Sequence, residues 1–144
     1  MAITNILVPF DGSSYSIKAF DAALDIAKQN GAKIKVLTCL EKENLGAWYK
    51  DKRINQKIIK DAKKFAMGFL SKLEKTAKDS GVLISLHVLE TKSISKQIID
   101  FAASKKINLI VIGSHGQTGF SRFLLGSVSN AVSQSAQCPV LIIK

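Results

Sequence analysis

The chain has 144 residues, 47% hydrophobic and 22% charged, a length and composition typical of a single globular domain over residues 1–144. No apolar run reaches the roughly 18 residues of a membrane-spanning helix, and the first residues lack a secretory leader pattern, so we expect a cytoplasmic protein. Two cysteines, Cys39 and Cys138, and two histidines give no metal-binding spacing, and reduced thiols are favoured over a disulfide.

Short apolar runs alternate with helical patterns along the chain. The runs predict strands over residues 3–9, 33–40, 82–90, 108–112 and 140–143. Helices are expected after the turn at residues 11–14, over 54–79, after a cap at Ser93 or Ser95, and over 127–136. This alternation predicts an α/β fold with a parallel sheet and right-handed crossovers.

The helix expected over residues 54–79 carries an apolar stripe and a basic face. The apolar positions repeat at the helical period and are expected to face the core: Ile58, Ala62, Phe65, Phe69 and Leu73. The basic positions are expected on roughly the opposite side: Arg53, Lys57, Lys60, Lys64, Lys75 and Lys78. Residues 50–79 hold ten Lys and Arg against four acids, and so contribute +6 to the chain's net charge of +10.

A basic face of this kind is most often simply solvated. It also fits an anionic partner, whether nucleic acid, an acidic protein or a membrane surface. No aromatic residue interleaves with these basic residues, and base stacking needs such residues, so a specific nucleic-acid role is disfavoured.

The most informative stretch covers residues 113–130 and reads GSHGQTGFSRFLLGSVSN. It follows an apolar strand and leads into a helix, with glycines at 113, 116 and 126 and a serine at 127. This spacing fits neither the phosphate loop that ends in Gly-Lys-Ser/Thr nor the dinucleotide-binding Gly-x-Gly-x-x-Gly. Loop glycines are most often turn residues, but a glycine backbone and the N–H groups of a helix start also suit a phosphate.

The spacing resembles the motif G-2x-G-9x-G-[ST] of the ATP-binding branch of the universal stress protein family. The Ser-His-Gly and Leu-Leu-Gly-Ser-Val pieces and the segment around Asp11, Val-Pro-Phe-Asp-Gly-Ser, are similar to that family too. The resemblance implies an adenine nucleotide alpha hydrolase-like fold, a three-layer open sheet of five parallel strands in the order 3-2-1-4-5 with helices on both faces. It also implies a homodimer formed through the apolar C-terminal strand, residues 138–143.

With that strand order, the loops after the first and fourth strands meet at the switch point of the sheet, where ligands bind. The resemblance assigns Pro9 and Asp11 to the adenosine, the backbone of Thr38 and Cys39 to the adenine edge, Ile112 and Gly113 to the ribose and first phosphate, and Gly116, Gly126, Ser127 and Val128 to the phosphates. Mg²⁺ would bridge phosphate oxygens without a direct protein ligand. A turn or a helix cap is the alternative role for Asp11.

Gln117 stands where the family often has a basic residue, and its neutral amide leaves ATP, ADP and AMP all open as ligands. His115 and Arg122 are the nearby basic side chains and, with Gln117, are possible phosphate contacts, while a structural or solvated role fits them as well. Trp48 and Tyr49 either pack over the edge of the core, or form a lid near the adenine or a partner contact.

These residues favour a binding protein over a dedicated enzyme. Phosphoryl transfer needs a positioned base and cationic groups around the transferred phosphate, and no carboxylate lies between Gly113 and Gln137. At most, slow ATP hydrolysis is expected. The leading hypothesis is an ATP-binding stress-response switch or sensor that acts on an unknown protein partner. The alternative is an interaction module that binds an anionic partner through the basic Arg53–Lys78 face without nucleotide.

Overall fold

Strands and helices alternate along the computed structural model, which describes residues 2–43, 45–47, 49–116 and 126–144. The elements and their bounds are β1 (Asn5–Pro9), α1 (Ser14–Asn30), β2 (Lys33–Glu41), α2 (Lys52–Asp79), β3 (Ile84–Thr91), α3 (Ile94–Ser104), β4 (Leu109–Gly113), α4 (Ser127–Ser135) and β5 (Val140–Ile143). Every element predicted from the sequence is present within these residues.

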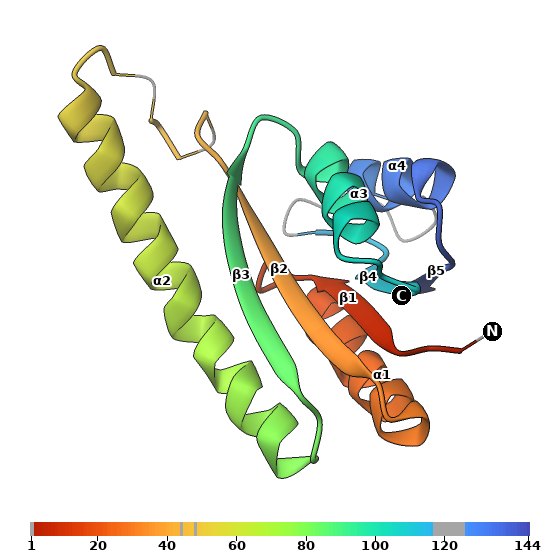
Figure 1. Cartoon of the computed structure of the whole chain (residues 1–144). Coiled ribbons are helices and arrows are strands. Elements are labelled where there is room, and N and C mark those ends of the chain that lie inside the picture. The colour runs from red at the N-terminus through yellow and green to blue at the C-terminus, as the bar shows by residue number, and fades with distance from the viewer. Residues whose placement is uncertain (1, 44, 48, 117–125) are drawn as a thin grey trace.

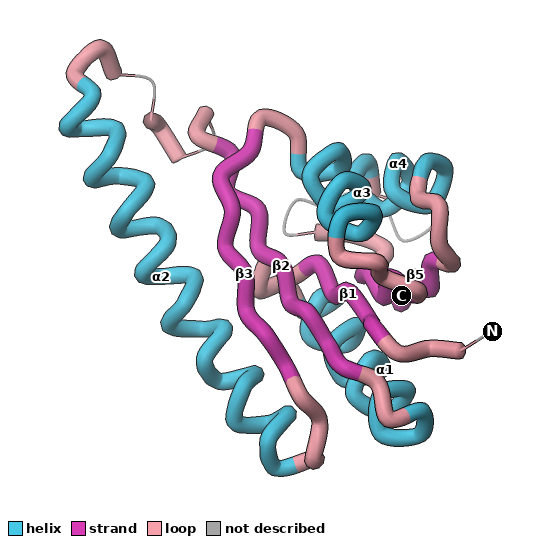
Figure 2. The backbone as a smooth tube through the Cα atoms, in the orientation of Figure 1, coloured by secondary structure: helices cyan, strands magenta, loops and turns pink. Residues whose placement is uncertain are grey.

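The five strands form one parallel sheet in the order β3-β2-β1-β4-β5. Figure 2 shows β1, β2 and β3 lying side by side, with the long helix α2 running alongside β3. The predicted order 3-2-1-4-5 is therefore confirmed. Its consequence is that β1 and β4 are neighbours, so that the loops that follow them leave the sheet at the same edge.

Side-chain caps explain where the helices begin. The Ser13 hydroxyl accepts a hydrogen bond from the Ser16 N–H at 3.2 Å, and the Asp51 carboxylate accepts one from the Arg53 N–H at 2.9 Å. Because Asp51 caps α2, that helix begins two residues earlier than predicted, at Lys52. Of the two candidate caps of α3, Ser93 is the one observed.

Two layers of apolar side chains hold the helices on the sheet. Ile6 and Val8 of β1 pack into the cluster under α1 and α2, whereas Leu7 packs into the cluster under α3 and α4. Successive side chains of a strand point to opposite faces, so a strand buried on both faces is apolar throughout. The three-layer arrangement with helices on both faces is therefore confirmed (Figure 1). None of the described helices is long and apolar enough to cross a membrane.

The predicted apolar stripe of α2 is wrong at Phe65, whose side chain is 76% exposed. The fully buried positions of the helix are Ile59, Ala66, Leu70 and Ala77. This line has the same helical period as the predicted stripe, so periodicity does not distinguish them. Its two alanines allow the backbone of α2 to approach β3 closely, which turns Phe65 away from the sheet.

We expect Leu70→Ala to lower the free energy of unfolding by about 2–5 kcal/mol, because it leaves a cavity under α2. Phe65→Ala removes a larger side chain but should change this free energy by less than about 0.5 kcal/mol, because that ring is largely in water. Urea denaturation followed by circular dichroism measures both values. Equal losses for the two variants would contradict the packing of α2.

Candidate functional site

The candidate site lies at the carboxyl edge of the sheet, where the loops after β1 and β4 meet. The two strands are paired through Ile6 with Leu109 and Leu7 with Ile110. A Cβ atom added to Gly116 would lie 2.7 Å from Oδ2 of Asp11. The expected convergence of the two loops is therefore present, and a side chain at residue 116 would displace the Asp11 carboxylate.

Asp11 organises the turn between β1 and α1. Its Oδ1 accepts a hydrogen bond from the Ser13 N–H at 2.9 Å, and its side chain remains exposed. The turn role suggested for Asp11 is thus real, whereas the cap of α1 is Ser13. A carboxylate held in this way at the mouth of the crevice can also accept hydrogen bonds from a bound hydroxyl group.

Gly113 is required by packing at the end of β4. A Cβ atom added there would lie 2.7 Å from Cβ of Tyr15 and 2.9 Å from its carbonyl carbon. The absence of a side chain at Gly113 therefore allows the first turn of α1 to rest against β4. Sequence reasoning did not single out Tyr15, because a tyrosine in a helix carries no spacing signal that marks it as the partner of a distant glycine.

The loop after β4 is tied together at its two ends. The carbonyl oxygen of the buried Ser114 accepts hydrogen bonds from the Gly126 N–H at 2.7 Å and from the Ser129 hydroxyl at 2.8 Å. The Ser114 N–H donates to the Ile143 carbonyl of β5 at 2.8 Å. These bonds hold the start of α4 beside Ser114 and His115. Gln117 and Arg122, the other candidate phosphate contacts in this loop, lie outside the described residues.

The first turn of α4 provides backbone donors. Its N-cap is Gly126, which has no side chain to accept a hydrogen bond from the turn, and Ser127 is exposed. The first N–H groups of a helix have no partner within the helix, and together they carry a partial positive charge. The start of α4 therefore suits an anionic group, in keeping with the roles expected for Ser127 and Val128.

The carboxyl end of β2 forms another wall. The pairing of β1 with β2 ends at Pro9 and Leu37, whereas β2 continues to Glu41. The Thr38 hydroxyl donates to the Phe10 carbonyl at 2.8 Å and is buried, so its side chain serves the fold. The backbone of Cys39 extends beyond the end of β1, where it is suited to an edge-on contact with a ligand.

Both cysteines are free thiols. Burial, reinforced by the negative charge of Glu41, raises the pKa of Cys39 to about 12. Burial also raises the pKa of Cys138. Because the thiolate is the reactive form, Cys39 is an inert neutral group at physiological pH, and its side chain is not a nucleophile.

His115 lies against the start of α1. Its Nδ1 is 3.0 Å from the Ser114 hydroxyl, and its ring centroid is 5.4 Å from that of Tyr15. Among the described residues, the buried Nε2 of His115 has no hydrogen-bond partner. The histidine is thus packed in place with one polar atom left over.

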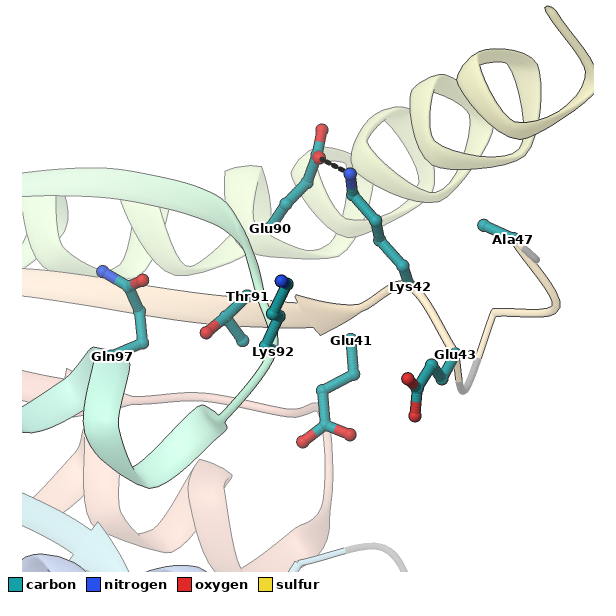
Figure 3. A pocket seen from close by; sticks show the side chains of 8 residues that line it. All are labelled: Glu41, Lys42, Glu43, Ala47, Glu90, Thr91, Lys92 and Gln97. Carbon is teal, nitrogen blue, oxygen red and sulfur yellow. Dashed lines mark ion pairs between the residues drawn. The ribbon is translucent and has the colours of Figure 1, made fainter. Parts of the chain in front are cut away.

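A further hollow of about 560 Å³ opens at the carboxyl ends of β2 and β3 (Figure 3). Glu90 of β3 reaches Lys42 at 3.5 Å and Lys63 of α2 at 2.9 Å. The hydrogen bond from Lys63, with help from Lys42, holds the pKa of Glu90 below its usual value. Glu90 therefore ties α2 and the segment after β2 to the edge of the sheet.

Trp48 lies outside the described residues, while Tyr49 is 51% exposed. The Tyr49 N–H donates to the side chain of Asn55 at 3.0 Å, and the Asn55 amide donates back to the Tyr49 carbonyl at 2.6 Å. The segment before α2 is therefore attached to that helix. Within the described ranges, no three His, Cys, Asp or Glu residues gather to hold a metal ion.

Solved structures share this architecture. A hypothetical protein whose structure was used to assign its biochemical function matches with a TM-score of 0.89 and 21% identity, covering 100% of this chain and 97% of that one. A universal stress protein in complex with cAMP matches with a TM-score of 0.71 and 26% identity, over 99% and 98% of the two chains. One from Archaeoglobus fulgidus in complex with dAMP matches with a TM-score of 0.68 and 25% identity, over 100% of both.

Curated relatives align over nearly the whole sequence. A universal stress protein of Methanocaldococcus jannaschii is 34% identical, over 96% of this chain and 81% of the relative. The universal stress protein YxiE of Bacillus subtilis is 32% identical, over 96% of this chain and 97% of the relative. The model of the universal stress protein family matches residues 2–144. The chain therefore belongs to the universal stress protein family.

Proposed function

We propose that the protein binds an adenine nucleotide, in the first place ATP with Mg²⁺, at the crevice between the β1 and β4 loops, and acts as a nucleotide-dependent switch or sensor. The observation that carries this proposal is the contact between Gly116 and Asp11, beside the start of α4. The Asp11 carboxylate can accept hydrogen bonds from hydroxyl groups of a ligand. The backbone of Gly116 and the first N–H groups of α4 can approach a phosphate.

The nucleotide is proposed to lie with its base at β2 and its phosphates at α4. The adenine edge meets the backbone of Thr38 and Cys39, while the ribose lies between Asp11 with Pro9 on one side and Ile112 with Gly113 on the other. The phosphates lie along the backbone of residues 116 and 126–128, where the N–H groups of Ser127 and Val128 are the donors, since that of Gly126 already donates to the Ser114 carbonyl. Mg²⁺ would be held through the phosphates, without a protein ligand. The Nε2 atom of His115, which has no hydrogen-bond partner within the described ranges, supports a further phosphate contact.

The ligands of two structural neighbours support an adenine nucleotide, since one is a complex with cAMP and the other with dAMP. Both of these ligands carry a single phosphate, fewer than ATP, so ADP and AMP remain the alternatives to ATP at this site. Asp11 already accepts a hydrogen bond from Ser13 and lies toward the ribose in this pose. Asp11 is therefore not placed to act as a base at the phosphates. The site is accordingly proposed to hold nucleotide, with at most slow hydrolysis.

We expect purified protein to release an adenine nucleotide on heating, identified by mass spectrometry, and Gly116→Asp to release none. The new carboxylate would crowd and repel both Asp11 and the phosphates. Gly68→Asp is the matched control, because a Cβ atom at Gly68 meets nothing within 4 Å.

ATP with Mg²⁺ at about 100 times its dissociation constant should raise the free energy of unfolding by about 2.7 kcal/mol in the wild-type chain and in Gly68→Asp. Gly116→Asp should show no such gain. Titration calorimetry with ATP, ADP, AMP and cAMP then ranks the ligands. Equal nucleotide binding by the Gly116→Asp variant would contradict the proposed site.

We further propose that the chain forms a homodimer through β5, which is an outer strand of the sheet and carries the 38% exposed Leu141. An apolar outer strand is protected when a second copy covers it. Light scattering after size exclusion should give twice the chain mass of 15.6 kDa. Leu141→Glu should give the monomer mass, whereas Leu83→Glu, at an exposed apolar residue outside β5, should not. A monomeric wild-type chain at micromolar concentration would refute this dimer.

A further inference from the structure

The outward surface of α2 carries a row of basic side chains, here called the basic crest. All of its members are exposed, and they recur at whole helical turns: Arg53, Lys57, Lys60, Lys64, Lys75 and Lys78. In the part of the chain that the structure describes, Arg53 pairs with Asp51 at 3.8 Å, and the five lysines make no ion pair. Lys63, in contrast, is already neutralised by Glu90. The five lysines of the crest therefore present their positive charge to solvent.

Beside the crest runs a line of apolar side chains, here called the apolar line. It contains Ile54, 45% exposed, Phe65, 76% exposed, and the half-buried Ile58 and Phe69. Single exposed apolar residues are ordinary on protein surfaces, but these four share one face of one helix. The charged crest and the exposed members of the apolar line, Ile54 and Phe65, together form one amphipathic surface, while Phe69 connects this line to the core.

The ring of Phe65 contacts another aromatic ring on its core side. It packs edge to face on Phe69 with centroids 5.8 Å apart, and Phe69 packs on the buried Phe10 at 5.8 Å. The ring of Phe65 is therefore backed by Phe69 while most of it remains exposed. Aromatic side chains, Phe among them, are enriched at protein interfaces.

We propose that the basic crest and the apolar line form a docking surface for an acidic partner protein, which sets carboxylates against the crest and an apolar side chain against Phe65. Charge complementarity selects this occupant, since a second copy of the same face would bring two crests of like charge together. The exposed Asp61 and Asp79 lie between the crest and the apolar line. They would repel the uniform phosphates of a membrane surface or a nucleic acid, whereas a protein can place a neutral or basic group opposite each one.

Two fluorescent helical peptides test this surface. One carries glutamates with leucines at helical spacing, and the other has every leucine replaced by glutamine at the same net charge. Fluorescence anisotropy should show the leucine peptide binding the wild-type chain about tenfold more tightly than the glutamine peptide. Phe65→Ala should remove this difference and leave the affinity for the glutamine peptide unchanged. Lys57→Glu with Lys64→Glu should weaken both peptides, as should added salt.

The matched control is Leu83→Ala, which removes a 69% exposed apolar side chain outside α2 and should alter neither affinity. Urea denaturation checks that every variant is folded. An equal leucine preference in Phe65→Ala would overturn the proposal. It would also be overturned if phosphatidylserine vesicles or single-stranded DNA bound more tightly than the leucine peptide in a Phe65-dependent manner. The surface shares no tested residue with the proposed nucleotide site, so each proposal can fail alone.

Discussion

The close approach of the β4 loop to the start of α1 is the contact on which the rest of the site depends. Because Gly113 has no side chain, Tyr15 and the first turn of α1 can rest against the end of β4, and Asp11 is carried to Gly116. Ser114 then fastens this loop to α4 through its carbonyl oxygen and to β5 through its N–H. Segments that lie about a hundred residues apart in the chain thereby lie side by side, and the pairing of β1 with β4 makes this possible.

The candidate site presents mainly backbone groups. Thr38 uses its hydroxyl within the fold, Cys39 is a neutral thiol whose pKa is raised by burial, and the start of α4 has a glycine at its cap. Glycines and the N–H groups of a helix start are the features by which such a site would take an anionic ligand.

Most of the net positive charge lies on α2, whose buried and exposed faces differ in character. The line of Ile59, Ala66, Leu70 and Ala77 holds the helix on the sheet, and Glu90 adds an ion pair with Lys63. The half-buried Phe69 also packs on Phe10 of the core, whereas Phe65 is left largely exposed to solvent. The buried line therefore holds the helix on the sheet, and the exposed Phe65 and basic residues lie on another part of its circumference.

The sequence by itself determined the alternation of strands and helices, because two-sided burial makes the strands apolar throughout and the serines near residues 13 and 93 mark two of the helix starts. The glycine spacing likewise identified the loop after β4, and the resemblance it carries implied the strand order. Only the tertiary structure decided which line of α2 is buried, since two lines of equal period compete and the fit of Ala66 and Ala77 against the sheet selects one. It alone revealed Tyr15 as the partner of Gly113 and Phe10 as the base under Phe69, because such contacts depend on distances between residues that no local pattern records.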